Sequence, residues 1–227
     1  MKKLLALACI ALTLFGSAAQ AQFFTTFIAI SGTPGPSYAT WPAGLTGSNL
    51  TISNAGRTVS ANTVSAWGTS QVSKYFSQKE YYEVTINNVG GNIYIGIEVE
   101  AGVTNLPFNG TGRTYAFAWL NTGGIWDGSG ELVSGIGSFT SGDVLMFAID
   151  PANKQGWYGK NGTWYNSGNP ATGTNPTFTT INASFQYSFG ATVSIYGGSG
   201  PSGQVTLNAG QAAFSYTVPT GFQAGIY

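Results

Sequence analysis

The chain has 227 residues with eight basic and eight acidic side chains, so 7% of its residues are charged and its formal net charge is zero. It has one cysteine and no histidine. This composition excludes the basic surface that nucleic-acid binding requires, and it excludes Ser-His-Asp catalysis, Cys-His catalysis and histidine-ligated zinc. The 33 glycines and the 14% aromatic residues favour an all-β protein, because aromatic residues suit pleated sheets and glycine suits turns.

Residues 1–21 have the pattern of a cleaved signal peptide: two lysines, an apolar run from Leu4 to Phe15, and a small-x-small site at Ala19–Ala21. The apolar run is shorter than the roughly 18–20 residues that span a bilayer. We therefore expect a mature chain that begins at Gln22, is secreted, periplasmic or on the cell surface, and does not insert into a membrane. Its net charge would be −2, from six basic and eight acidic residues, and without a cysteine it would form no disulfide.

Residues 22–48 are predicted to be an N-terminal arm and linker that precede the main domain. An apolar segment, Phe23–Ile30, is followed by a Gly- and Pro-rich stretch, residues 31–44. The apolar segment has two interpretations: an edge strand laid on the main domain, or an assembly arm that pairs with a neighbouring molecule. The sequence does not decide between them.

The main domain, residues 49–227, shows short strand patterns separated by turn residues and no helical periodicity. The clearest strands before residue 140 are Tyr81–Ile86, Asn92–Val99 and Tyr115–Asn121, each rich in aromatic or β-branched residues. Trp119 lies in such a run, as does Phe147 further along the chain, and both are predicted to be buried in the core.

The stretch from Gly142 to Pro176 is the most informative part of the chain. Val144–Ile149 is an apolar run of strand length, Gly156–Lys160 is an aromatic strand, and Thr163–Tyr165 is a third strand. Between the last two lies Asn161-Gly162, the strongest short signal for a two-residue hairpin turn, because both residues tolerate a positive φ. The pattern predicts three consecutive antiparallel strands.

The order of these motifs resembles the C-terminal core of the SPRY domain. The matching features are a Gly-Asp-Val opening at Gly142, an apolar strand that ends in Asp150, an aromatic strand, and then Lys160-Asn161-Gly162 and Trp164. Glu83-Val84 and Gly96-Ile97 match upstream motifs, while Gln78 and Tyr82 stand where the family usually has glycine and tryptophan. The sequence after Trp164 is similar to SPRY-like domains of bacterial and phage proteins.

The resemblance covers about Leu50 to Phe222 and implies an antiparallel, two-sheet β-sandwich of the SPRY, concanavalin-like jelly-roll type. SPRY domains generally bind protein segments, without catalysis, cofactor or metal, through loops at one edge of the sandwich. The resemblance therefore implies a non-catalytic binding module for a protein segment or a surface glycan.

Four residues are the candidate ligand contacts: Trp67, Arg113, Trp126 and Asp127. The segments around them, including the loop from Leu106 to Arg113, are rich in Gly, Ser or Thr. We expect both tryptophans and the arginine to lie on exposed loops and to share one surface, since aromatic rings and arginine supply much of the energy at binding sites. The alternative for Arg113 is a surface ion pair of little energetic value.

Two further functions remain open, glycoside hydrolysis and a structural role in an assembly, and so does a calcium site. Paired carboxylates can hydrolyse glycosides, and the pool is Glu83, Glu98, Glu100, Asp127 and Glu131. The Gly-rich stretch from Asp127 to Glu131 has oxygen ligands for calcium, although a plain turn is the simpler interpretation. The low charge and the apolar arm would also suit a structural subunit of an extracellular or virion assembly.

Overall fold

The computed structural model describes residues 35–99, 116–127, 130–179, 189–200 and 202–227. Residues Tyr38–Tyr227 form one compact unit, and Met1–Ser37 form another, of which the described residues 35–37 have no regular secondary structure. The described residues contain fourteen strands and three short 3₁₀ helices: η1 (Ala43–Leu45), η2 (Asn54–Gly56) and η3 (Tyr165–Ser167). In this part of the chain, no helix is long and apolar enough to cross a bilayer.

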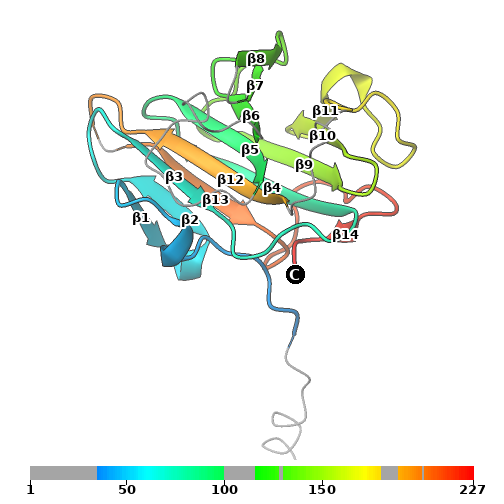
Figure 1. Ribbon diagram of the computed structural model, residues 1–227, viewed down its shortest axis with the longest axis horizontal. Coiled ribbons are helices and arrows are strands. Elements are labelled where there is room, and N and C mark those ends of the chain that lie inside the picture. The colour runs from blue at the N-terminus through cyan, green and yellow to red at the C-terminus, as the bar shows by residue number, and fades with distance from the viewer. Residues whose placement is uncertain (1–34, 100–115, 128–129, 180–188, 201) are drawn as a thin grey trace, which may run out of the picture. The chain divides into compact units, whose positions relative to one another are not determined.

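The strands form two sheets, which confirms the predicted all-β class (Figure 1). In the larger sheet the order is β1 (Leu50–Ser53), β2 (Thr58–Ala61), β13 (Gln204–Asn208), β4 (Glu80–Asn88), β9 (Val144–Asp150), β10 (Gln155–Lys160) and β11 (Thr163–Trp164), with β14 (Gln223–Ala224) parallel to β4. In the smaller sheet the order is β3 (Trp67–Gln71), β12 (Phe189–Tyr196), β5 (Ile93–Val99), β6 (Ala116–Leu120), β7 (Ile125–Asp127) and β8 (Gly130–Val133). All neighbours within the smaller sheet are antiparallel.

The core lies between the inner faces of the two sheets. Alternation places Ile93, Ile95 and Ile97 of β5 on the inner face, where all three are buried. Phe147 of β9 is fully buried, and Trp119 of β6 is 2% exposed, so both predicted core residues are confirmed. The sheets are also joined by hydrogen bonds, because the buried Tyr82 hydroxyl donates to the Gly96 carbonyl oxygen across the core at 3.0 Å.

The predicted three-strand unit is present as β9, β10 and β11. Asn161 has a φ of 51° and Gly162 a φ of 85°, so both turn residues adopt the left-handed conformation that a tight hairpin requires. The Asn161 side chain also accepts a hydrogen bond from the Val144 backbone N–H at 2.9 Å. The third strand ends at Trp164, one residue earlier than predicted, because Tyr165 begins η3.

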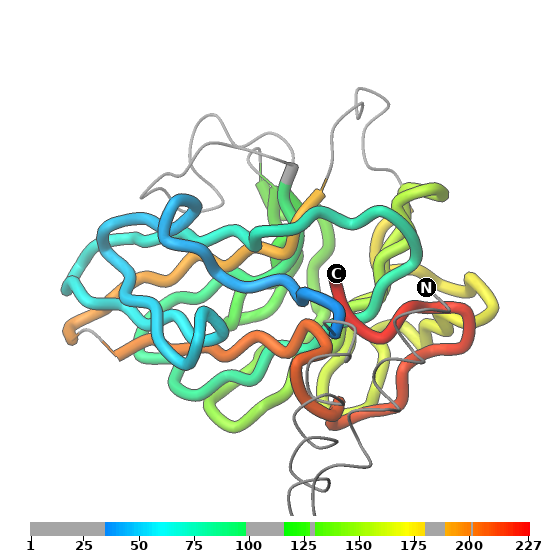
Figure 2. The backbone as a smooth tube through the Cα atoms, turned by 90° about the horizontal axis from the view of Figure 1, so that it is seen from below, coloured from blue at the N-terminus to red at the C-terminus, as the bar shows by residue number. Residues whose placement is uncertain are grey.

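The segment just before β1 belongs to the sandwich, contrary to the expected boundary after residue 48. Ala39 and Trp41 are buried in the core. The Ala39 backbone N–H donates to the Ile226 carbonyl oxygen at 2.8 Å, which joins the two ends of the compact unit, blue and red in Figure 2. The apolar segment Phe23–Ile30 lies outside the described residues.

The outer face of the larger sheet is covered by the chain after β13. Phe214, Tyr216, Val218 and Phe222 pack on an apolar cluster formed by Tyr81, Met146, Ala148 and Trp157. The buried carboxylate of Glu83 holds this segment, because it accepts hydrogen bonds from the Ser215 and Tyr216 backbone N–H groups, both at 2.9 Å. This C-terminal segment therefore closes one outer face of the sandwich.

Candidate functional site

Trp67 lies in a strand and not in the polar loop that the sequence predicted. It is the first residue of β3, which pairs with β12 so that Trp67 lies opposite Tyr196. Its ring is centred 5.2 Å from the ring of Tyr196 and 5.6 Å from that of Tyr94 in β5. The side chain is half-buried on the outer face of the smaller sheet.

Trp126 also lies in a strand, so the predicted loop position is wrong for both tryptophans. It is the middle residue of β7 and pairs with Ala118 of β6. Its ring is centred 6.4 Å from the ring of Tyr94 in an edge-to-face arrangement. Both tryptophans therefore contact Tyr94, which connects them into one group.

We call Trp67, Tyr94, Trp126 and Tyr196 the outer aromatic cluster. Strand alternation explains its position, since the isoleucines on either side of Tyr94 point into the core and Tyr94 points outward. Two small residues of the neighbouring strand β6, Ala116 and Ala118, are buried beside the rings. Residues from four strands thus form one aromatic surface outside the sandwich core.

The outer aromatic cluster combines a buried centre with accessible edges. Tyr94 is 3% exposed, whereas Trp67, Trp126 and Tyr196 are half-buried. Burial raises the pKa of the Tyr94 hydroxyl above its usual value, so this hydroxyl stays protonated at physiological pH and can donate a hydrogen bond. Such a group of rings presents apolar area and π faces to a ligand.

The sequence analysis missed Tyr94 and Tyr196. Tyr94 occupies an alternate position of an otherwise isoleucine-rich strand, and that pattern is the signal that marks it as outward-facing. Tyr196 is the last residue of β12, and all the residues before it in that strand are buried. An alternation of buried and exposed residues therefore does not mark Tyr196 as outward-facing.

Asp127 is at the end of β7, next to the cluster. Its Oδ1 accepts a hydrogen bond from the Gly130 backbone N–H at 3.0 Å, and β8 begins at Gly130. This contact joins the end of β7 to the start of β8, and the two strands are paired. Among the described residues, no group of three or more carboxylate, cysteine or histidine side chains is placed to hold a metal ion.

Arg113, Glu100 and the loop from Leu106 to Arg113 lie outside the described residues. The expectation that Arg113 shares one ligand surface with the two tryptophans therefore stays a prediction.

Two strand carboxylates of the proposed catalytic pool, Glu98 and Glu83, are buried, whereas Glu131 in β8 is exposed. Glu98 of β5 is 4% exposed. Glu83 is 2% exposed and, besides the two backbone N–H groups, it accepts a hydrogen bond from the Tyr81 hydroxyl at 2.7 Å. Its oxygens are engaged in holding the C-terminal segment, which is a structural role.

Comparisons with known proteins agree with this architecture. No protein-family model and no curated protein matches the sequence. Among solved structures, the chain is similar to the SPRY domain of human HERC1, with 19% identity over 76% of this chain and 99% of that one and a TM-score of 0.57. It is also similar to a human SPRY domain, with 17% identity over 73% of this chain and 98% of that one and a TM-score of 0.52. The chain therefore has the fold of a SPRY domain.

Proposed function

We propose that this protein is an exported, non-catalytic binding module that recognises a protein segment through the outer aromatic cluster. The observation that carries the proposal is that Trp67, Tyr94 and Trp126, from three different strands, form one connected, partly exposed aromatic surface. Rings of this kind supply much of the binding energy at protein interfaces. The likeness to SPRY domains supports a protein segment as the ligand.

A surface glycan is the second candidate ligand. The four members of the outer aromatic cluster carry no formal charge, and flat half-buried rings provide the apolar faces on which sugars stack. A glycan array, run beside a pull-down from an envelope or host extract, distinguishes the two ligand classes directly.

The proposal includes export, which rests on the signal-peptide pattern of residues 1–21. The mature protein should begin at Gln22 and behave identically with and without reductant, since the single cysteine, Cys9, lies in the leader. N-terminal mass spectrometry of exported protein tests this directly. Recovery of Met1, or of a lipid on Cys9, would contradict it.

The binding test uses the mature protein and two single variants, Trp67→Ala and Trp126→Ala. If the cluster is the contact surface, each variant should weaken binding by about 1–4 kcal/mol, roughly 5- to 1,000-fold in Kd. Leu132→Ala is the matched control, because Leu132 is 46% exposed in β8 and lies outside the cluster. Variants that stay folded and retain full affinity for the captured ligand would contradict the assignment of the cluster.

A further inference from the structure

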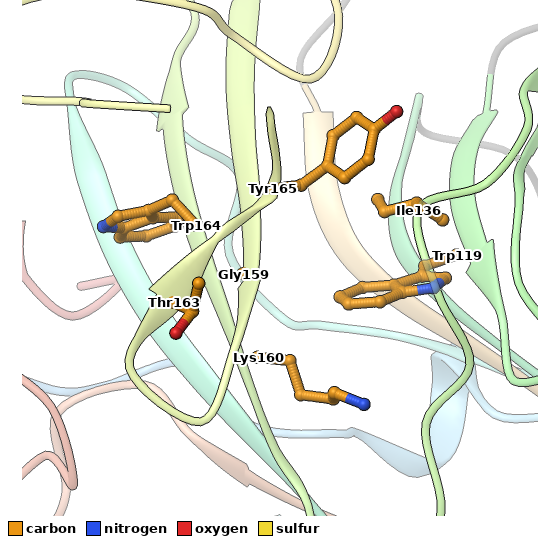
Figure 3. A pocket seen from close by; sticks show the side chains of 7 residues that line it. All are labelled: Trp119, Ile136, Gly159, Lys160, Thr163, Trp164 and Tyr165. Carbon is orange, nitrogen blue, oxygen red and sulfur yellow. The ribbon is translucent and has the colours of Figure 1, made fainter. Parts of the chain in front are cut away.

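A cleft of about 250 Å³ lies beside the β10–β11 hairpin, apart from the outer aromatic cluster. It opens between this hairpin and the segment that joins β8 to β9. The lining residues are Trp119, Ile136, Gly159, Lys160, Thr163, Trp164 and Tyr165. Figure 3 shows the Tyr165 ring next to Ile136 at one end, Trp119 along the same side, and Lys160 at the other end.

The apolar wall of the cleft is held in place by contacts outside it. The Trp119 indole N–H donates to the Gly137 carbonyl oxygen at 2.8 Å, which ties the wall to the residue next to Ile136. The Trp119 ring also packs edge-to-face against Phe139, with centroids 5.6 Å apart. Trp119 is 2% exposed and Ile136 is 8% exposed. A preformed wall loses little conformational entropy when a ligand binds.

The volume of the cleft indicates which class of ligand it can hold. Pockets for whole small-molecule ligands usually enclose about 300–1,000 Å³. At about 250 Å³ this cleft is smaller and suits one large apolar side chain. A side chain of a partner protein that inserts here would pack against the Tyr165 ring, Ile136 and Trp119, which line the cleft.

Lys160 gives the cleft its polarity, because it is the one charged residue among the described residues that line it. Its Nζ donates to the Ser138 carbonyl oxygen at 2.6 Å and forms an ion pair with Asp143, 3.7 Å from Oδ2. Asp143 also accepts hydrogen bonds from the Thr140 backbone N–H at 2.9 Å and from the Asn161 side-chain amide at 2.7 Å, so its charge is shared among three partners. An ammonium group has three donors, so Lys160 keeps donors for a ligand acceptor.

We infer that this cleft anchors an apolar side chain of a partner protein segment that carries a carboxylate one or two residues away, with Lys160 as the counter-charge. The inference rests on the proposed function and identifies a second contact area for the same class of partner. Charge complementarity favours an acidic segment, because a carboxylate forms its strongest hydrogen bonds with charged donors.

The test is selection from a phage-displayed library of random peptides on the immobilised mature protein. Enriched peptides should share an aromatic or large aliphatic residue next to Asp or Glu. Their affinity should fall about tenfold or more for Tyr165→Ala, as expected for a hot-spot residue, and should recover in Tyr165→Phe, which keeps the ring. For Lys160→Gln the affinity should fall about three- to tenfold and should lose its dependence on salt.

Leu132→Ala is the matched control for lost apolar area, and Lys74→Gln is the control for lost charge, because Lys74 is a partly exposed lysine between β3 and β4 that does not line the cleft. Lys160→Gln changes a side chain that is 36% exposed, so it keeps the test available if Tyr165→Ala does not fold. Peptides that bind all cleft variants equally, or whose binding depends only on Trp67 and Trp126, would contradict the cleft as a binding site and would still agree with the proposed binding of a protein segment. If no peptide is enriched, or if the protein binds only glycans, both the cleft as a peptide site and the proposed binding of a protein segment are contradicted.

Discussion

Glu80 makes the stability of this protein depend on pH in a range where few other groups titrate. It is the first residue of β4 and is fully buried. Burial raises the pKa of its carboxyl group from 4.5 to about 7. The chain has no histidine, so a change in the free energy of unfolding between pH 5 and pH 8.5 should come mainly from this carboxyl group.

The direction of the effect follows from proton binding. Between the unfolded pKa of 4.5 and the folded pKa of about 7, the folded state binds more protons than the unfolded state. Stability therefore falls as pH rises through this interval. The difference is about 2.5 pKa units, or roughly 3 kcal/mol in total, of which about 2.5 kcal/mol is lost between pH 5 and pH 8.5.

Glu80→Gln should remove this dependence, because the amide does not ionise. Urea unfolding of the wild type and the variant at pH 5 and pH 8.5 measures the change. The wild type should lose about 2.5 kcal/mol over this range, and Glu80→Gln should stay nearly level. Glu131→Gln, in the exposed part of β8, is the control that should follow the wild type. An equal pH slope in the wild type and Glu80→Gln would refute the reasoning.

Three other predictions concern packing and the C-terminal segment. Phe147→Ala should cost about 3–5 kcal/mol in a urea unfolding titration, since the ring stacks on Tyr82 at 4.7 Å in the core; a loss below about 1 kcal/mol would contradict its core role. Glu83→Leu should leave the Ser215 and Tyr216 N–H groups without their acceptor, which should raise amide hydrogen exchange after residue 210 and lower the free energy of unfolding by about 2–4 kcal/mol. Unchanged exchange there would contradict the role of Glu83 in holding the C-terminal segment. Trp126→Ala should lower the free energy of unfolding by about 1–2 kcal/mol through its lost contact with Tyr94, and a cost above about 3 kcal/mol would show that the ring is core.

The local sequence was sufficient to predict the structure of the hairpin region, β9 to β11. Asn161-Gly162 tolerates the positive φ angles of a tight turn, and the flanking runs have strand length. The bounds of β9, β10 and β11 were therefore predictable, each to within one residue. Residues within strand runs, such as Trp119 and Phe147, were predictable as core for the same reason. The motif order also predicted the sandwich class.

The binding surface depended on contacts between distant parts of the chain. Trp67 follows polar residues, so a local pattern suggests a loop, but pairing with β12, more than a hundred residues later, places it in a strand beside Tyr196. The cleft likewise forms only where the segment containing Ile136 meets the β10–β11 hairpin. Strand order and long-range packing decide which side chains become neighbours, and local periodicity carries no information about that order. The sequence by itself therefore determined the strands of the hairpin region, their turn and the fold class, whereas the tertiary structure decided which rings form one surface.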